Sequence, residues 1–84
     1  MTATPITGRA LAMLRAVAQG RAELAGGREP DLRVDGLQCT DQATAHHLAH
    51  AGLVRAVEPG SPGQWVRAEL TPEGTRVLAL NSAA

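Results

Sequence analysis

The chain has 84 residues, 44% of them hydrophobic, which suits one small globular domain over residues 1–84 but leaves little room for a deep catalytic cleft. Its eight Arg, no Lys and eight acidic residues give a formal net charge of zero, without the basic excess that is typical of nucleic-acid-binding proteins. The single cysteine excludes an intramolecular disulfide, and no apolar run approaches the ~18 residues of a membrane span. Residues 1–6 lack a basic stretch followed by an apolar run, so we expect no secretory signal and a cytoplasmic protein.

A first helix is predicted to begin after Thr7, whose side chain can cap its N-terminus. Ile6 and Leu11 occupy the two positions of a hydrophobic staple across this cap. Leu11 and Leu14 then recur at helical spacing, and Gly20 is placed to end the helix with a positive φ.

Residues 21–38 form the least regular stretch of the chain. The segment 21–24 could be a strand, and residues 25–30 have the composition of a loop. Apolar and polar residues alternate in Leu32–Val34, and Asp35-Gly36 is a strong turn dipeptide. We predict a short irregular hairpin here.

A second helix is predicted to begin at Thr40 or Asp41, to run to Ala51 and to end at Gly52. At about 100° per residue, its positions divide into two faces. The apolar face, suited to docking on a core, holds Thr44, Ala45, Leu48 and Gly52. The polar face holds Gln42, Ala43, His46, His47 and His50.

The remaining residues predict a hairpin and a short final helix. Leu53–Val57 is a short β-branched segment, residues 58–63 are rich in Pro and Gly, and Gln64–Leu70 alternates as a strand does. Thr71-Pro72 is an N-cap followed by proline at the first helical position. The helix should continue to Leu80, with residues 81–84 frayed.

Two motifs flank this hairpin: Leu-Ala-His-Ala-Gly-Leu-Val at residues 48–54 and Leu-Thr-Pro-Glu-Gly-Thr-Arg-Val-Leu at residues 70–78. At this spacing the pair resembles winged-helix regulators of the MarR type, over Thr40 to Leu80. In those proteins a recognition helix ends in Gly-Leu-Val, and the second wing strand ends in Leu-Thr-x-x-Gly. The resemblance implies a small α+β winged-helix domain: helix, irregular or short strand segment, recognition helix, β-hairpin wing and short C-terminal helix.

The chain departs from this family before the second helix. The family has a short helix there, whereas residues 21–39 contain Gly26-Gly27, Pro30 and Asp35-Gly36, all unfavourable inside a helix. That helix is therefore either reduced or replaced by strand. The long terminal helices through which MarR-type proteins dimerise are absent, so the sequence gives no support for a homodimer.

The resemblance implies a small sequence-specific DNA-binding transcription regulator of bacterial or phage type. The 41–51 helix would enter the major groove of double-stranded DNA, and the 53–70 wing would contact backbone or minor groove. The candidate contacts are Gln42, Ala43, His46, His47, His50, Arg55 and Arg67. The alternative is a protein-interaction module on the same scaffold, such as a phage accessory or adaptor protein. Arginines around the histidine-bearing face would favour DNA, and acids there would favour a protein partner.

The sequence predicts neither an enzyme nor a metal or cofactor site. His46 and His50 have the spacing of two metal ligands on a helix, but no third ligand is evident. No Gly-x-Ser-x-Gly motif is present, and Ser61 falls in the predicted wing loop. We expect Trp65 to fill the core and Cys39 to be a small buried hydrophobe.

Overall fold

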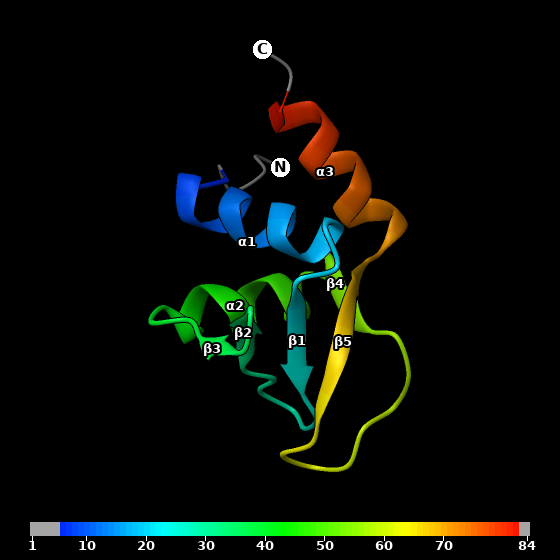
Figure 1. The fold of residues 1–84 in the computed structure, drawn as a ribbon. Helices are drawn as coiled ribbons and strands as arrows, with labels where there is room; N and C mark the ends of the chain where they lie inside the picture. The colour runs from blue at the N-terminus through cyan, green and yellow to red at the C-terminus, as the bar shows by residue number, and fades with distance from the viewer. Residues whose placement is uncertain (1–5, 83–84) are drawn as a thin grey trace.

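Three helices and five strands make up the computed structural model, which describes residues 6–82 (Figure 1). In chain order they are α1 (Gly8–Ala18), β1 (Ala22–Ala25), β2 (Leu32–Val34), β3 (Leu37–Gln38), α2 (Gln42–His50), β4 (Val54–Ala56), β5 (Trp65–Leu70) and α3 (Pro72–Ser82). The predicted α+β class is confirmed.

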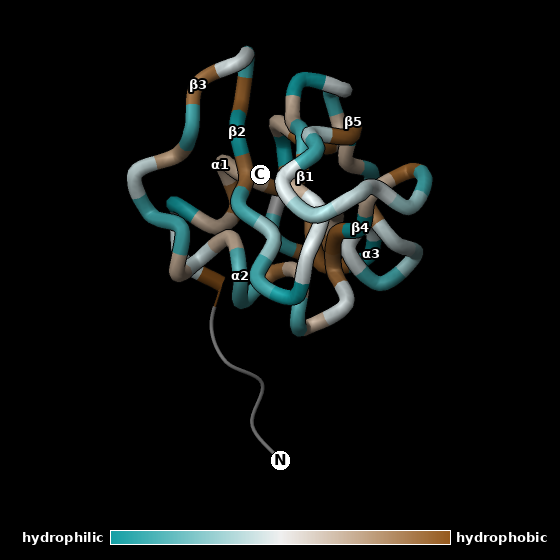
Figure 2. The backbone as a smooth tube through the Cα atoms, turned by 90° about the horizontal axis from the view of Figure 1, so that it is seen from below, coloured by the Kyte–Doolittle hydropathy of each residue, from teal (hydrophilic) through white to brown (hydrophobic). Residues whose placement is uncertain are grey.

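The five strands form one antiparallel sheet in the order β3-β2-β1-β5-β4, which Figure 2 shows from below. The central strand β1 pairs with β2 on one side and with β5 on the other, so that Leu24 lies opposite both Leu32 and Val66. Helix α1 contacts both α2 and α3, and in Figure 1 it lies between them. The largest fully buried side chains are Leu14, Leu32 and Leu48, so α1, β2 and α2 meet in the core.

The predicted helix starts are confirmed by their capping bonds. Thr7 Oγ1 accepts a hydrogen bond from the Ala10 N–H at 3.0 Å, and Asp41 Oδ1 accepts one from the Thr44 N–H at 3.0 Å. Thr71 Oγ1 accepts one from the Gly74 N–H, also at 3.0 Å. These bonds satisfy N–H groups that have no partner within their own helix.

Two helix ends differ from the prediction. Helix α2 ends at His50, with Ala51 as its C-cap, one residue earlier than expected. Fraying at Asn81 and Ser82 was predicted wrongly: α3 continues through Ser82, and the Asn81 amide donates to the Val77 carbonyl at 2.8 Å. Residues 83–84 lie outside the described part of the chain.

Between α1 and α2 the chain forms strands, which settles the choice between a reduced helix and a strand. Asp35 (φ 54°) and Gly36 (φ 80°) connect β2 and β3, and this pair of positive φ angles fits a two-residue hairpin turn. Instead of one irregular hairpin, β1, β2 and β3 form a meander that continues the sheet.

The predicted second hairpin is confirmed with shorter strands. β4 covers only Val54–Ala56 and pairs with the end of β5, with Val54 opposite Leu70. The first half of β5 pairs with β1 instead, which joins the hairpin to the rest of the sheet. Trp65 does not fill the core: it is half-buried outside it, with the Arg33 guanidinium 4.5 Å from its ring centroid.

The two motifs around this hairpin lie against each other. The Thr71 hydroxyl donates to the Gly52 carbonyl at 2.5 Å, and the Thr71 N–H donates to the Leu53 carbonyl at 3.1 Å. Gly74 is buried there, and a Cβ on it would lie 1.9 Å from the Leu53 carbonyl oxygen. Only glycine allows α3 to approach the end of α2 so closely.

Candidate functional site

The side chain of Gln42 binds the neighbouring hairpin instead of facing solvent. Its Oε1 accepts from the Leu32 N–H at 2.8 Å, and its Nε2 donates to the carbonyls of Leu32 (2.9 Å) and Cys39 (2.6 Å). These bonds fix β2 and the residue that follows β3 to the first turn of α2. Contact between this amide and a DNA base would require breaking all three.

Two of the three histidines face carboxylates from the loop between β1 and β2. His46 has its Nδ1 3.2 Å from Glu29 Oε2 and its Nε2 2.7 Å from Asp31 Oδ1. His50 Nε2 lies 3.1 Å from the Arg28 carbonyl oxygen and 3.5 Å from Glu29 Oε1. The polar face of α2 is therefore bordered by acids, and its histidines connect that loop to the helix.

Within residues 6–82, no group of three or more His, Cys, Asp or Glu side chains is arranged to hold a metal ion. His46 is hydrogen-bonded to Asp31 and His50 to the Arg28 carbonyl, and Glu29 lies within 3.5 Å of both imidazoles.

The other predicted contacts lie apart from this cluster. Ala43 and His47 are exposed on α2. Arg55, on β4, forms an ion pair with Glu69 of β5 at 2.7 Å. Arg67 is exposed on β5 and has no ion pair within the described residues. Of the seven predicted DNA contacts, three are thus exposed to solvent, and the other four bind groups of the same chain.

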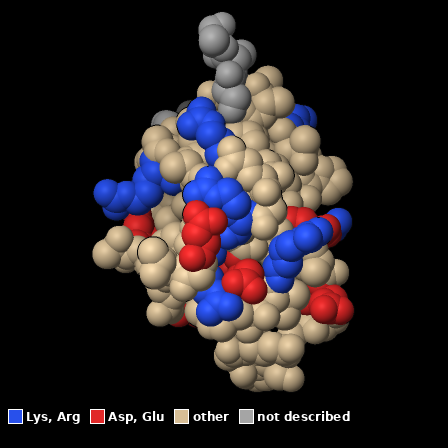
Figure 3. All heavy atoms as spheres, in the orientation of Figure 1, with Lys and Arg blue, Asp and Glu red and all other residues tan. Residues whose placement is uncertain are grey.

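Arginines and acids alternate over the surface. Five of the eight arginines form ion pairs with acids of the same chain: Arg9, Arg21, Arg33, Arg55 and Arg76. Figure 3 shows blue and red side chains next to one another on the face seen there. Each pair lowers the positive potential that a polyanion would meet, and Arg15, Arg28 and Arg67 have no ion pair within residues 6–82.

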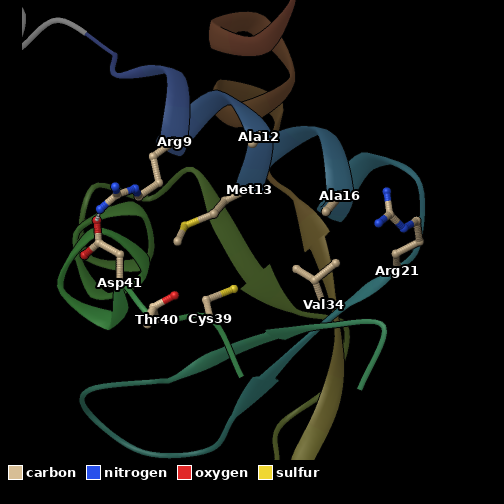
Figure 4. Close-up of a pocket in the computed structure, with 9 residues that line it drawn as sticks. All are labelled: Arg9, Ala12, Met13, Ala16, Arg21, Val34, Cys39, Thr40 and Asp41. Carbon is tan, nitrogen blue, oxygen red and sulfur yellow. Dashed lines mark hydrogen bonds and ion pairs between the residues drawn. The ribbon is translucent and has the colours of Figure 1, made fainter. Parts of the chain in front are cut away.

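A groove of about 780 Å³ between α1 and the β2–β3 hairpin was not predicted from the sequence (Figure 4). Its lining consists of small or apolar side chains with charged residues at the ends: Arg9, Ala12, Met13, Ala16, Arg21, Val34, Cys39, Thr40 and Asp41. In Figure 4, Met13 extends from α1 toward Cys39 on the opposite side. The hollow lies beside the β2–β3 hairpin, which occupies the chain between β1 and α2.

One side of the groove is the apolar face of the hairpin. Val34 and Leu37 are paired across the strands, and the Cys39 N–H donates to the Leu32 carbonyl at 3.1 Å, so these four side chains share a face. Their burial decreases along the hairpin, from Leu32 at 1% exposed to Leu37 at 75% exposed. The signal in the sequence was the alternation Leu32-x-Val34 and Leu37-x-Cys39 on either side of the Asp-Gly turn.

An ion pair lies at each end of the groove. Arg9 Nη1 is 3.1 Å from Asp41 Oδ2. The Thr44 hydroxyl and N–H, with a further contribution from Arg9, lower the pKa of Asp41 to about 2. At the other end, Arg21 lies 2.7 Å from Asp35 and lowers the pKa of that carboxyl through its hydrogen bonds.

Cys39 is half-buried between these ends. Burial, with a smaller effect of the Asp41 charge, raises the pKa of its thiol. Because burial favours the protonated thiol, Cys39 contributes an apolar, polarisable surface to the groove.

No protein-family model, no curated protein and no solved structure matches this chain. Among the described residues, no helix has both the length and the apolar character to cross a membrane.

Proposed function

We propose that this chain is a protein-interaction module, a small adaptor built on a winged-helix-like scaffold. The order of elements supports the scaffold: a helix, a strand, a second helix, a hairpin and a third helix, with strands β2 and β3 in place of a short helix. The observation that carries the function is the position of Glu29 and Asp31 against His46 on the polar face of α2. Acids beside this face repel phosphate and suit a protein partner.

The internal pairing of five arginines supports the same proposal. A DNA-binding surface gains affinity by exchanging counterions for Arg and Lys side chains, and this chain has already matched most of its arginines with its own carboxylates. The groove beside α1 offers a recognition surface that depends on apolar contact instead. We propose binding and not catalysis as the role of this surface.

Sequence-specific DNA binding is the second candidate function. It is favoured by three exposed side chains on the helix and wing that a winged-helix regulator would use: Ala43, His47 and Arg67. Ala43 could contact a thymine methyl group, His47 a base or phosphate, and Arg67 a phosphate.

The test that separates these functions is a salt titration of DNA binding. Fluorescence anisotropy would be measured with random duplex DNA and with fragmented genomic DNA from the source cells. We expect no salt-dependent binding even at low ionic strength. Tight binding that falls steeply with salt, and that His47→Ala weakens for specific sites by ~1–3 kcal/mol, would instead establish the DNA-binding function.

A matched pair of variants tests partner binding directly. Ala12→Gln places a larger side chain in the groove, whereas Ala79→Gln makes the same change on an exposed position of α3. Proteins retained from a lysate of the source cells would be compared by quantitative mass spectrometry. We expect a partner protein that is retained by wild type and by Ala79→Gln but not by Ala12→Gln. If all three proteins retain the same partners, the groove is not the surface that carries the proposed function.

A further inference from the structure

We infer that the groove between α1 and the β2–β3 hairpin binds an acidic amphipathic α-helix of a partner protein. This inference rests on the proposed function and specifies the partner of the same groove. It follows from the extent of the apolar surface, the small side chains along α1 and the charges around the rim.

The apolar surface extends beyond the groove itself. Leu37 is 75% exposed, and because it is paired with Val34 it lies on the hairpin face that borders the groove. Any occupant confined to the groove would leave Leu37 in water. An occupant that rests on both Val34 and Leu37 must have the width of a secondary-structure element, which for a helix with its side chains is about 10 Å.

The wall formed by α1 suits a helix lying alongside it. Ala12 and Ala16 are one turn apart and both line the groove, so another backbone can approach closely. Met13 and Cys39 supply soft surfaces that adapt to the side chains of an occupant (Figure 4). Helix α1 has 11 residues and is about 16 Å long, which matches three turns of a partner helix with apolar anchors at i, i+3 or i+4, and i+7.

Arg9 and Arg21 lie on the α1 side of the groove, whereas the carboxylates that pair with them, Asp41 and Asp35, lie at the start of α2 and in the hairpin turn. Arg9 uses one guanidinium N–H for Asp41, and its other donors have no hydrogen-bond partner within the described residues. Arg15 is exposed next to Ala12 on the helix surface and forms no ion pair within residues 6–82. Asp41 is less available, because Thr44 and Arg9 already bind its oxygens. Carboxylates on the occupant complement this rim.

A second copy of the chain fits this groove less well. Helices α1 and α2 contain no acidic residue, so neither of them is an acidic helix that a second copy could supply. The exposed α3 has one acid in its first turn, Glu73, and Arg76 already pairs with it. The acidic helix must therefore come from a different protein.

A selection experiment tests this inference without requiring the natural partner. A yeast-display library of 18-residue helices would carry variable apolar anchors and variable acidic, basic or amide residues on the polar positions. The library would be sorted against the full chain alone, and the retained helices would then be tested on Ala12→Gln and Ala79→Gln. We expect the retained helices to be acidic, to bind the Ala79→Gln control as they bind wild type, and to lose binding to Ala12→Gln.

The charge preference is then measured by anisotropy on the best helix and on its Glu-to-Gln form. Arg9→Gln should reduce affinity for the acidic form about fivefold and leave the amide form unchanged, whereas Arg76→Gln on α3 should affect neither. Retained helices that are neutral or basic would overturn the acidic specificity while leaving the groove as a protein site. If no selected helix depends on Ala12 for binding, the inference as a whole is wrong. The proposed adaptor function would still hold if a partner protein is retained from lysate through another surface of the chain.

Discussion

Gly74 is buried in the first turn of α3, at the point where this helix meets the chain leaving α2. The Leu53 carbonyl oxygen occupies the space that a Cβ would need. The Thr71 side chain and N–H bind the Gly52 and Leu53 carbonyls at the same point. The spacing of these residues in the sequence thus reflects a single contact between two chain segments.

Gly74→Ala should destabilise the protein by roughly 1–3 kcal/mol, because the new methyl group forces the first turn of α3 away from Leu53. Chemical denaturation measures this change. Gly8→Ala is the control: it makes the same substitution at the start of α1, where a Cβ would meet no atom within 4 Å. At Gly8 the higher helix propensity of alanine should leave stability unchanged or improved. Equal effects at the two positions would contradict the packing role of Gly74.

Gln42 has a structural role that its place on the polar face of α2 does not reveal. Gln42→Ala removes three hydrogen bonds to the hairpin and should lower the free energy of unfolding by about 1–3 kcal/mol. The exposed His47→Ala, on the same helix, should stay within about 0.5 kcal/mol of wild type. Thermal and urea unfolding of both variants measure the difference, and a neutral Gln42→Ala would show that the hairpin does not need this amide.

At the scale of elements, the N-terminus of α2 joins three parts of the structure. Asp41 caps the helix, pairs with Arg9 of α1 and lines one end of the groove. Gln42 holds β2, and His46 holds the loop before it. The position of the β2–β3 hairpin, and with it the width of the groove, depends on these contacts with α2.

The lowered pKa of Asp41 predicts a loss of stability in acid. Its carboxyl has a pKa of about 2 in the folded chain, against an ordinary 3.8, so the capping contribution is complete above about pH 4 and is lost as the pH falls toward 2. Asp41→Ser keeps a capping oxygen without this titration and should lose less stability than wild type between about pH 5 and about pH 2. Unfolding measured across that range checks the prediction, with Glu58→Gln as a control at an exposed acid that has no ion pair among the described residues. The same pH profile for Asp41→Ser and wild type would contradict it.

At the scale of the whole molecule, the distribution of charge separates the candidate functions. The chain pairs five of its eight arginines internally and borders the histidine-bearing face with acids. The groove beside α1 has an ion pair at each end, Arg9–Asp41 and Arg21–Asp35. We therefore expect the affinity for a partner protein to depend more on the side chains of the groove than on the ionic strength. The salt titration and the Ala12→Gln variant test this at the level of the intact chain.

The local features of the fold could be predicted from the sequence. Thr7, Asp41 and Thr71 indicated the helix starts, and Asp35-Gly36 indicated a turn, because capping bonds and positive φ angles depend on residues within a few positions of each other. The hairpin of β4 and β5 followed from alternation around a Pro/Gly loop for the same reason.

The contacts of the polar side chains could not be predicted, because they depend on packing between segments that are distant in the sequence. The positions of Glu29 and Asp31 against His46, and of the Leu32 backbone against Gln42, result from the way in which the β1–β2 loop and β2 pack on α2. The groove likewise exists because β2 and β3 continue the sheet while α1 crosses above them. Helical periodicity placed Gln42, His46 and His50 on one face, but it contains no information on which segment distant in the sequence covers that face.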